Sequence, residues 1–349
     1  MHRIRSRSLR PLMAGAAAVF AVTLLAGCTS SGDEGDGGSN GGTTSEENAA
    51  TGDTVTIGWS GPEADHGWLG AINTGAINAA ESFGDVELMQ AEGTNDANQQ
   101  IAAVEKFIND GVDAIVLLPT DGAALTQVAQ KAMDAGIPVI NVDREFSSTF
   151  ASRATILGDN YGMGVSAGTY ICEQLDGNTD AVVGEIAGID SLPLTQDRSQ
   201  GFKDALEGCG LEVGPRVAAD FTVAGGETAA SQLLAANPQI DAIWNHDDDQ
   251  GVGVMAAIEA AGRDEFFLVG GAGSVNMMDR IKADDSVIKA TVIYPSTQAA
   301  DGIALARLIA QGKTLSDLVT PTVPYRIVLD APVVTKDNVD EFIKLAFES

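Results

Sequence analysis

The feature that most constrains the fold is a unit of one short, mostly apolar strand followed by one amphipathic helix, which recurs along residues 54–329. In the helix predicted over 97–110, for example, Ile101, Val104 and Phe107 repeat at helical spacing. Apolar strands that alternate with helices are typical of parallel sheets covered on both faces. The predicted strands cover residues 55–59, 86–89, 114–118, 137–142, 181–186, 216–220, 241–244, 266–270, 287–293 and 325–329.

The helices between these strands predict an α/β fold with two doubly wound parallel-sheet (Rossmann-like) lobes, because the pattern restarts near residue 158. We expect residues 53–157 plus 295–322 to form an N-terminal lobe. Residues 158–294 plus 323–349 form the C-terminal lobe, so three crossings near 157, 294 and 323 make the hinge. The predicted helices cover residues 70–83, 97–110, 121–135, 160–175, 196–208, 226–236, 250–262, 274–283 and 297–311.

Polar and aromatic residues follow most of the predicted strands. Open parallel sheets bind ligands outside the carboxyl ends of their strands, so facing lobes would bind a ligand in the cleft between them. Carboxylates beside arginines can satisfy sugar hydroxyls, which both donate and accept, and aromatic planes suit the apolar face of a sugar ring. The predicted ligand-binding residues are Asp65, His66, Trp68, Asp143, Arg144, Arg198, Phe221, Asp247, Ala272 and Tyr294.

Each of these residues also has a purely structural interpretation. Trp68 begins an amphipathic helix and can belong to the core. Asp143 and Arg144 can form an exposed ion pair that contributes little stability. The acids that begin at Asp247 can simply favour a helix N-terminus through its dipole. The functional interpretation rests on the fact that several independent strands end in this way.

The first residues predict export. Four arginines up to Arg10 precede an apolar run over residues 12–25, which is the pattern of a signal peptide over 1–27. The run ends in Leu25-Ala26-Gly27-Cys28, which resembles a bacterial lipobox, so we expect Cys28 to carry the lipid that anchors the protein to the outer face of the cell membrane. Residues 28–52 are polar and small, which predicts a flexible tether.

The charge balance narrows the possible partners. The chain holds 49 acidic and 20 basic residues, which argues against nucleic acid as a partner. Besides Cys28, the chain has Cys172 and Cys209. In an exported protein this pair can form one disulfide or remain as two buried thiols, and the sequence leaves both alternatives open.

Motifs of catalysis are missing from the sequence. It contains no Gly-x-Ser-x-Gly elbow and no Gly-Lys-Ser/Thr phosphate loop. The Gly251-Val-Gly253 segment lies too far from its strand to act as a dinucleotide fingerprint. We therefore predict a binding protein without enzymatic activity, cofactor or metal.

Four segments resemble the type I periplasmic binding proteins, specifically their ribose- and galactose-binding branch. These are the Asp143-Arg144 strand end, the Asp159-Asn160 crossing, the segment 197–202 that contains Arg198, and the segment 219–221 that ends in Phe221. The resemblance implies ligand roles for Asp143, Arg144, Arg198 and Phe221. It also implies a monomer that closes by its hinge around a sugar or polyol and delivers it to an ABC permease with its ATPase.

Three departures from that family bear on the ligand. Asp247 stands where the family has Asn, Ala272 where it often has Asp, and Tyr294 where ribose binders have Gln. They predict a monosaccharide or polyol that need not be ribose. The alternative function is a chemoreceptor of the same fold, which presents a sugar-derived autoinducer or a nucleoside to a membrane receptor.

Overall fold

The computed structural model describes residues 45–313 and 323–349. The predicted signal peptide (1–27), the lipidation site Cys28 and residues 28–44 of the predicted tether lie outside the described residues, as does the segment 314–322. Within the described residues the chain forms two sheets of six strands each. The predicted α/β fold with two sheet-based lobes is confirmed.

The first sheet has the strand order β11-β5-β4-β3-β1-β2, and all of its neighbouring strands are parallel. Every residue of the central strands β3 and β4 is buried, as expected for strands that are covered on both faces. The strands are β1 (Val55–Ser60), β2 (Val86–Gln90), β3 (Ala114–Leu117), β4 (Val139–Val142), β5 (Ala154–Gly158) and β11 (Arg326–Leu329).

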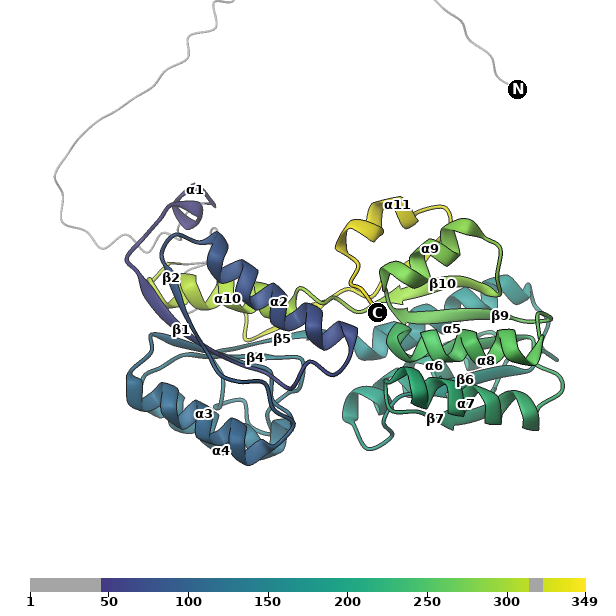
Figure 1. Cartoon of the computed structure of the whole chain (residues 1–349), viewed down its shortest axis with the longest axis horizontal. Helices are drawn as coiled ribbons and strands as arrows, with labels where there is room; N and C mark the ends of the chain where they lie inside the picture. Colours follow the sequence, from purple (N-terminus) through teal and green to yellow (C-terminus); the bar gives the residue numbers. More distant parts are fainter. Residues whose placement is uncertain (1–44, 314–322) are drawn as a thin grey trace, which may run out of the picture. The chain divides into compact units, whose positions relative to one another are not determined.

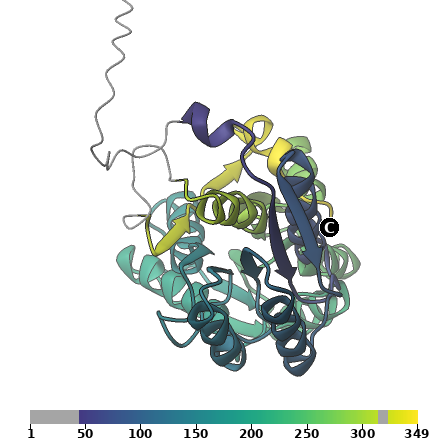
Figure 2. The ribbon, with the colours of Figure 1, turned by 90° about the vertical axis from the view of Figure 1, so that its left-hand side faces the viewer.

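Helices cover both faces of this sheet. On one face, α2 (Gly67–Ser82) lies beside α10 (Gln298–Ala310), and on the other α3 (Ala97–Asp110) lies beside α4 (Gly122–Asp134) (Figure 1; Figure 2). The side chains of Asp96 and Asp121 accept backbone N–H groups at the starts of α3 and α4, so the local sequence sets where these helices begin.

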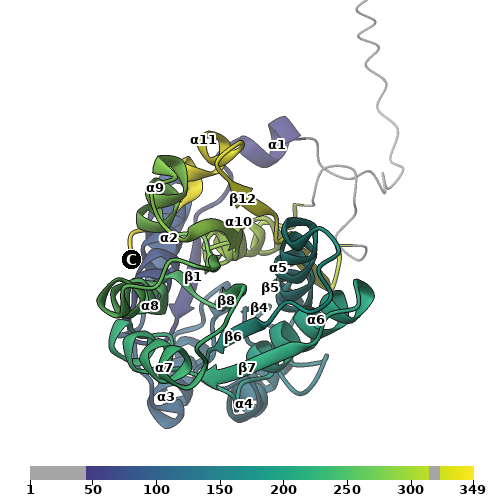
Figure 3. The same ribbon diagram turned by 90° about the vertical axis from the view of Figure 1, so that its right-hand side faces the viewer.

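The second sheet has the order β12-β10-β9-β8-β6-β7, and only its edge strand β12 is antiparallel to its neighbour. Helices α5 and α6 lie on one face, and α7, α8 and α9 on the other (Figure 3). The strands are β6 (Val183–Ala187), β7 (Val213–Ala218), β8 (Ala242–Asn245), β9 (Phe267–Ala272), β10 (Ile288–Ile293) and β12 (Val333–Thr335). The helices are α5 (Asn160–Leu175), α6 (Pro193–Gly208), α7 (Val223–Ala236), α8 (Asp248–Ala261) and α9 (Val275–Ala283), with α11 (Val339–Phe342) and the 3-10 helix η2 (Ile343–Leu345) near the C-terminus.

Two strands were not predicted. β5 follows β4 through residues 143–153 without an intervening helix, so it breaks the alternation on which the prediction depended. β12 has only three residues, and it pairs with β10, which lies about 40 residues earlier in the chain. The strand predicted over 216–220 is observed earlier, at 213–218. It includes Pro215, which lacks a donor N–H and is tolerated because β7 is an edge strand with a register shift at that point.

The third lobe crossing corrects the sequence-based boundary. The sequence predicts residues 323–349 in the C-terminal lobe, but Arg326–Leu329 pairs with β5 of the first sheet. The chain crosses to the second sheet between Leu329 and Val333, where β12 begins. An isolated strand gives no sequence signal for the sheet that it joins, because both sheets offer an apolar neighbour.

The predicted tether is also corrected at its end. Residues 45–49 form the short helix α1, and the segment that follows binds to the first lobe. Arg307 of α10 donates from Nη1 to the carbonyl of Asn48 and from Nη2 to that of Ala50. The same guanidinium binds both carboxylate oxygens of Asp85 at 2.5 Å. These bonds hold the pKa of Asp85 well below its usual range and fix residues 48–50 in place.

A disulfide joins α5 to the end of α6. Cys172 and Cys209 are bonded, and both pack against the apolar core of the lobe. Of the two alternatives that the sequence left open, the structure therefore contains the disulfide, between residues 37 positions apart.

Substituting Arg307 tests the importance of this buried ion pair. Arg307→Met leaves the Asp85 carboxylate buried without its partner, so we expect the free energy of unfolding to fall by about 3–5 kcal/mol in urea denaturation. The control is Arg326→Met, which breaks an exposed ion pair with Glu145 and should cost at most about 1 kcal/mol. Equal losses in the two variants would show that the buried pair has no special role.

Candidate ligand-binding site

The loop between β1 and α2 brings the first lobe into contact with the second. His66 precedes α2 in an extended conformation, and its Nδ1 lies 3.0 Å from Oδ2 of Asp249 at the start of α8. The same oxygen accepts the backbone N–H of Trp68 at 3.0 Å. Asp65 lies at the edge of this contact, because its half-exposed side chain accepts a hydrogen bond from Asn95.

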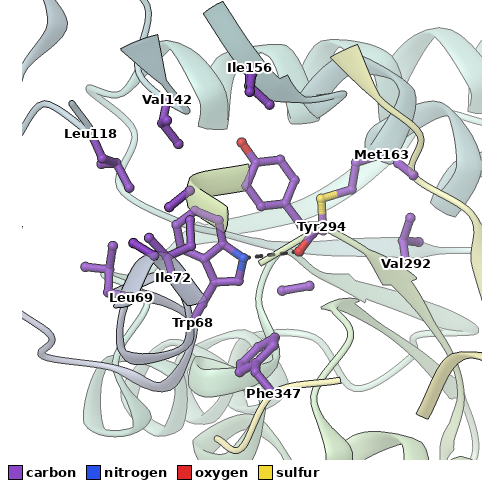
Figure 4. Close-up of a cluster of buried hydrophobic side chains, with 14 of the residues drawn as sticks. Trp68, Leu69, Ile72, Leu118, Val142, Ile156, Met163, Val292, Tyr294 and Phe347 are labelled. Carbon is purple, nitrogen blue, oxygen red and sulfur yellow. Dashed lines mark hydrogen bonds between the residues drawn. The ribbon is translucent and has the colours of Figure 1, made fainter. Parts of the chain in front are cut away.

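Trp68 is a buried residue that contacts the second crossing of the chain. Its indole Nε1 donates to the carbonyl oxygen of Tyr294 at 3.1 Å, and the two ring centres lie 5.3 Å apart (Figure 4). Trp68 also belongs to the apolar core, together with Leu69 and Ile72 of the same helix. The indole therefore has both a structural role and a polar contact within the candidate site.

Asp143 ends β4 in the left-handed region, with φ of 63°. Its buried carboxylate accepts the hydroxyl of Tyr294 at 2.5 Å through Oδ1, while Oδ2 lies 3.6 Å from Nε of Arg144. Arg144 itself is directed elsewhere, since its Nη1 donates to the carbonyl oxygen of Thr120 at 3.0 Å. The adjacent Asp143 and Arg144 thus keep an ion-pair contact, but only the aspartate contacts the other predicted residues.

Arg198 is the second lobe's contribution and is buried on α6. Its Nε donates to Oδ1 of Asn160 at 2.9 Å, and its Nη1 donates to the carbonyl oxygen of His246 at 3.0 Å. The guanidinium carbon lies 4.6 Å from the ring centre of Tyr294 and 5.9 Å from that of Phe221. Arg198 is therefore fixed in direction and lies near two aromatic rings.

Phe221 is held by backbone geometry. It adopts φ of 67°, and its N–H donates to Oε1 of Gln250. A Cβ at Gly188 would lie 2.0 Å from the Phe221 ring, so glycine is required for this close approach. The position of the Phe221 ring therefore depends on Gln250, which binds the backbone, and on Gly188, which leaves room for the ring.

Asp247 caps α8 and accepts the N–H groups of Asp249 and Gln250. Burial and the neighbouring Asp249 carboxylate raise the pKa of Asp247 to about 6. Ala272 ends β9 with φ of 78°, and its carbonyl oxygen accepts the N–H of Tyr294. Asp247 and Ala272 therefore lie at the same edge of the second sheet, as predicted for adjacent parallel strands.

Five residues form what we call the interlobe cluster: Trp68, Asp143, Asn160, Arg198 and Tyr294. Hydrogen bonds or ring contacts join each of them to at least one other member. Tyr294 is central, because its hydroxyl donates to Asp143 of the first lobe and accepts from Nδ2 of Asn160 at 3.1 Å. The arrangement can bind a hydroxyl group from two sides, once as acceptor and once as donor.

Several residues of this region were not predicted as site residues. Asn160 was noted only as a crossing motif, and Asp249 only as part of an acidic run. Asp248 accepts the N–H groups of Gly271, Gly273 and Ser274 and therefore shapes the turn after β9. The sequence signal was present in the three consecutive acids, but the sequence does not show which direction each side chain takes.

A buried pair of polar residues, Glu185 and His246, lies next to Arg198. The Nε2 atom of His246 lies 2.9 Å from Oε1 of Glu185, which is also 3.2 Å from Arg216 through its other oxygen. Burial lowers the pKa of His246, although Glu185 opposes this shift. Because His246 provides the carbonyl that Arg198 binds, this group helps to orient the guanidinium.

The part of the chain that the structure describes contains no helix long and apolar enough to span a bilayer. Over the same residues, no group of three or more His, Cys, Asp or Glu side chains is placed to hold a metal ion.

Residues 57–314 match the periplasmic binding protein domain family. This chain belongs to that family. The resemblance inferred from the strand-end motifs is thereby confirmed. Because the match spans most of both lobes, it includes all of the interlobe cluster.

Individual relatives are similar over most of their length. A D-ribose/D-allose-binding protein of Pseudomonas aeruginosa is 30% identical over 224 residues, which are 63% of this chain and 70% of that protein. The ribose import binding protein of Bacillus subtilis is 28% identical over 268 residues, 75% and 85% of the two chains. A crystal structure of a Mycobacterium smegmatis protein in complex with β-D-fucofuranose is 27% identical, with a TM-score of 0.73 and coverage of 83% of this chain and 94% of that one.

The contact between His66 and Asp249 should depend on pH. Burial disfavours the imidazolium, but the hydrogen bond to Asp249 and the carboxylates of Asp247 and Asp65 outweigh it, so the pKa of His66 is raised. A raised pKa adds stability that is complete below the unfolded value of 6.5 and is lost as the pH rises through the folded value. We expect His66→Gln to cost about 1 kcal/mol more at pH 5 than at pH 8.5 in urea denaturation.

A double-mutant cycle with Asp249→Asn provides the control, because it isolates the pairwise term from the bond between Asp249 and Trp68. The coupling energy between the two substitutions should decrease from pH 5 to pH 8.5. A coupling that is constant over this range would contradict the assignment of His66 as the titrating partner.

Proposed function

We propose that this protein is the extracytoplasmic solute-binding component of an ABC importer and that it captures a monosaccharide or polyol between its two lobes. The observation that carries the proposal is the environment of the Tyr294 hydroxyl. Asp143 of the first lobe accepts a hydrogen bond from this hydroxyl, and Asn160 of the second lobe donates one to its oxygen. A hydroxyl-rich ligand needs this combination, and it needs it from both lobes at once.

Further residues suit the same ligand class. We assign Asp143, Arg198 and Asp247 to hydrogen bonding with ligand hydroxyls, and the rings of Trp68 and Phe221 to its apolar faces. His66, Ala272 and Tyr294 complete the proposed site, with Asp65 and Arg144 at its edge. The names of the relatives support this ligand class, because they refer to ribose, allose and a furanose sugar.

Binding would act through the three crossings between the lobes. A ligand that contacts Asp143 and Arg198 together stabilises the state in which the lobes are closed, since only that state offers both groups. We propose a monomer as the binding unit. The closed form would then be recognised by the permease, and binding would involve no chemical turnover.

A thermal-shift screen against pentoses, hexoses, polyols and nucleosides tests the ligand class. A ligand that binds only the folded protein adds about 2.7 kcal/mol of stability at a hundredfold excess over its Kd. We expect a sugar or polyol to raise the melting temperature, and Asp143→Asn to weaken its binding about tenfold or more through loss of a charged acceptor.

The matched control is Asp110→Asn on α3, which removes an exposed carboxylate that pairs with Lys106. This variant should bind like the native protein. A shift only with nucleosides would contradict the proposed ligand class. Loss of sugar uptake on gene deletion would support transport, whereas intact uptake with a lost sugar response would support the chemoreceptor alternative.

We further propose that the protein is exported and anchored by a lipid on Cys28. The support is the cationic and apolar leader that ends in Leu25-Ala26-Gly27-Cys28. A single acyl chain binds membranes only weakly, so the proposal requires more than one chain on this cysteine. We expect the native protein to sediment with membranes and Cys28→Ser to appear in the soluble fraction. Sedimentation of both would contradict the anchor.

A further inference from the structure

Tyr294 fills a hydrogen-bonding position at the centre of the interlobe cluster. Its side chain is almost completely buried, and its hydroxyl bonds to Asp143 at 2.5 Å and to Asn160 at 3.1 Å. Its carbonyl oxygen accepts a hydrogen bond from the Trp68 indole (Figure 4). Its ring lies 4.6 Å from the Arg198 guanidinium carbon. Asp143, Asn160 and Trp68 therefore each form a hydrogen bond with Tyr294.

The ring is also held between two crossings of the chain. Tyr294 directly follows β10, at the second crossing, and packs on Gly158 at the end of β5, at the first. A Cβ at Gly158 would lie 2.1 Å from the Tyr294 ring, so only glycine permits this contact. The close packing of its ring on Gly158 thus places the hydroxyl on Asp143.

The contacts of Asp143 show what this placement blocks. The side chain of Asp143 is 2% exposed, and its Oδ1 is bonded to the Tyr294 hydroxyl. Oδ2 lies 3.6 Å from Arg144, beyond an ordinary hydrogen bond. Each carboxylate oxygen can accept more than one hydrogen bond, but the burial of Asp143 leaves no room for a second donor beside the phenol. A ligand hydroxyl therefore reaches Oδ1 by exchange with the phenol.

We propose that Tyr294 is an affinity- and specificity-determining residue that competes with the ligand for Asp143 from within the protein. This inference rests on the proposed function. A ligand must replace the phenol hydroxyl with one of its own, so its apparent affinity is lower than its contacts alone would give. Ligands with a hydroxyl that can reach both Asp143 and Asn160 are favoured, because they restore both bonds of the phenol.

The protonation of Tyr294 is consistent with this role. Burial and the Asp143 carboxylate raise its pKa, so the phenol remains a donor throughout the physiological range. The competition therefore does not depend on pH through Tyr294 itself.

Removal of one oxygen atom provides the test. Tyr294→Phe retains the ring against Gly158 and Trp68 but releases Asp143. We expect isothermal titration with D-ribose, D-allose and myo-inositol to give a Kd about tenfold lower for the best of these probes, together with a lower melting temperature without ligand. The matched control is Tyr161→Phe, which removes an exposed phenol that donates to Asp204 at 2.9 Å and should leave the Kd unchanged.

The outcomes separate the two proposals. Binding to the native protein with an unchanged or higher Kd in Tyr294→Phe overturns the internal competition but leaves the proposed function intact. Failure of all three probes to bind either protein, with no other sugar or polyol active in the screen, overturns both, because Asp143 then accepts no ligand hydroxyl.

A second measurement does not require the Tyr294→Phe variant to fold. The chain has four tyrosines, and 3-fluorotyrosine labelling gives each a fluorine resonance. Tyr161→Phe, Tyr170→Phe and Tyr325→Phe assign the other three, so the fourth belongs to Tyr294. We expect a saturating probe to move the Tyr294 resonance, and an unmoved resonance would overturn the competition.

Discussion

The three consecutive carboxylates at the start of α8 are the constraint on which the binding region depends. Asp247 accepts N–H groups of its own helix, and Asp248 accepts three N–H groups and a hydroxyl around the turn after β9. Asp249 reaches His66 and Trp68 of the first lobe. A helix N-terminus favours negative charge and supplies free donors, so three neighbouring acids can be buried there with different partners.

The interlobe cluster also consists of largely buried polar groups that satisfy one another, and it lies at the crossings of the chain. Asn160 and Gly158 lie at the first crossing and Tyr294 at the second, so the hydrogen bonds of the site and the contacts of the hinge involve the same residues. Buried polar groups are costly when unpaired, and the phenol provides Asp143 with a partner. If a ligand replaced the Tyr294 phenol on Asp143, the contacts at the positions where the lobes are joined would therefore change.

Much of this region could be predicted from local sequence. Parallel strands place their carboxyl ends at one edge of a sheet, and the two lobes were expected to face each other at these edges. The residues after β4 of the first sheet were therefore expected near those after β8 and β9 of the second. Arg144 shows the limit of this reasoning, because it lies at the correct edge but donates to Thr120 instead of the cluster. A long side chain can reach several acceptors, and its choice depends on neighbours that are distant in sequence.

The sequence by itself determined the α/β class, the two lobes and the polar strand ends, because periodicity and strand-end chemistry are properties of short segments. Only the tertiary structure decided that β11 joins the first sheet, that Cys172 bonds to Cys209, and that Tyr294 bonds to Asp143. These three facts join residues far apart in the chain. They depend on which surfaces pack together, and no local pattern of residue types specifies that.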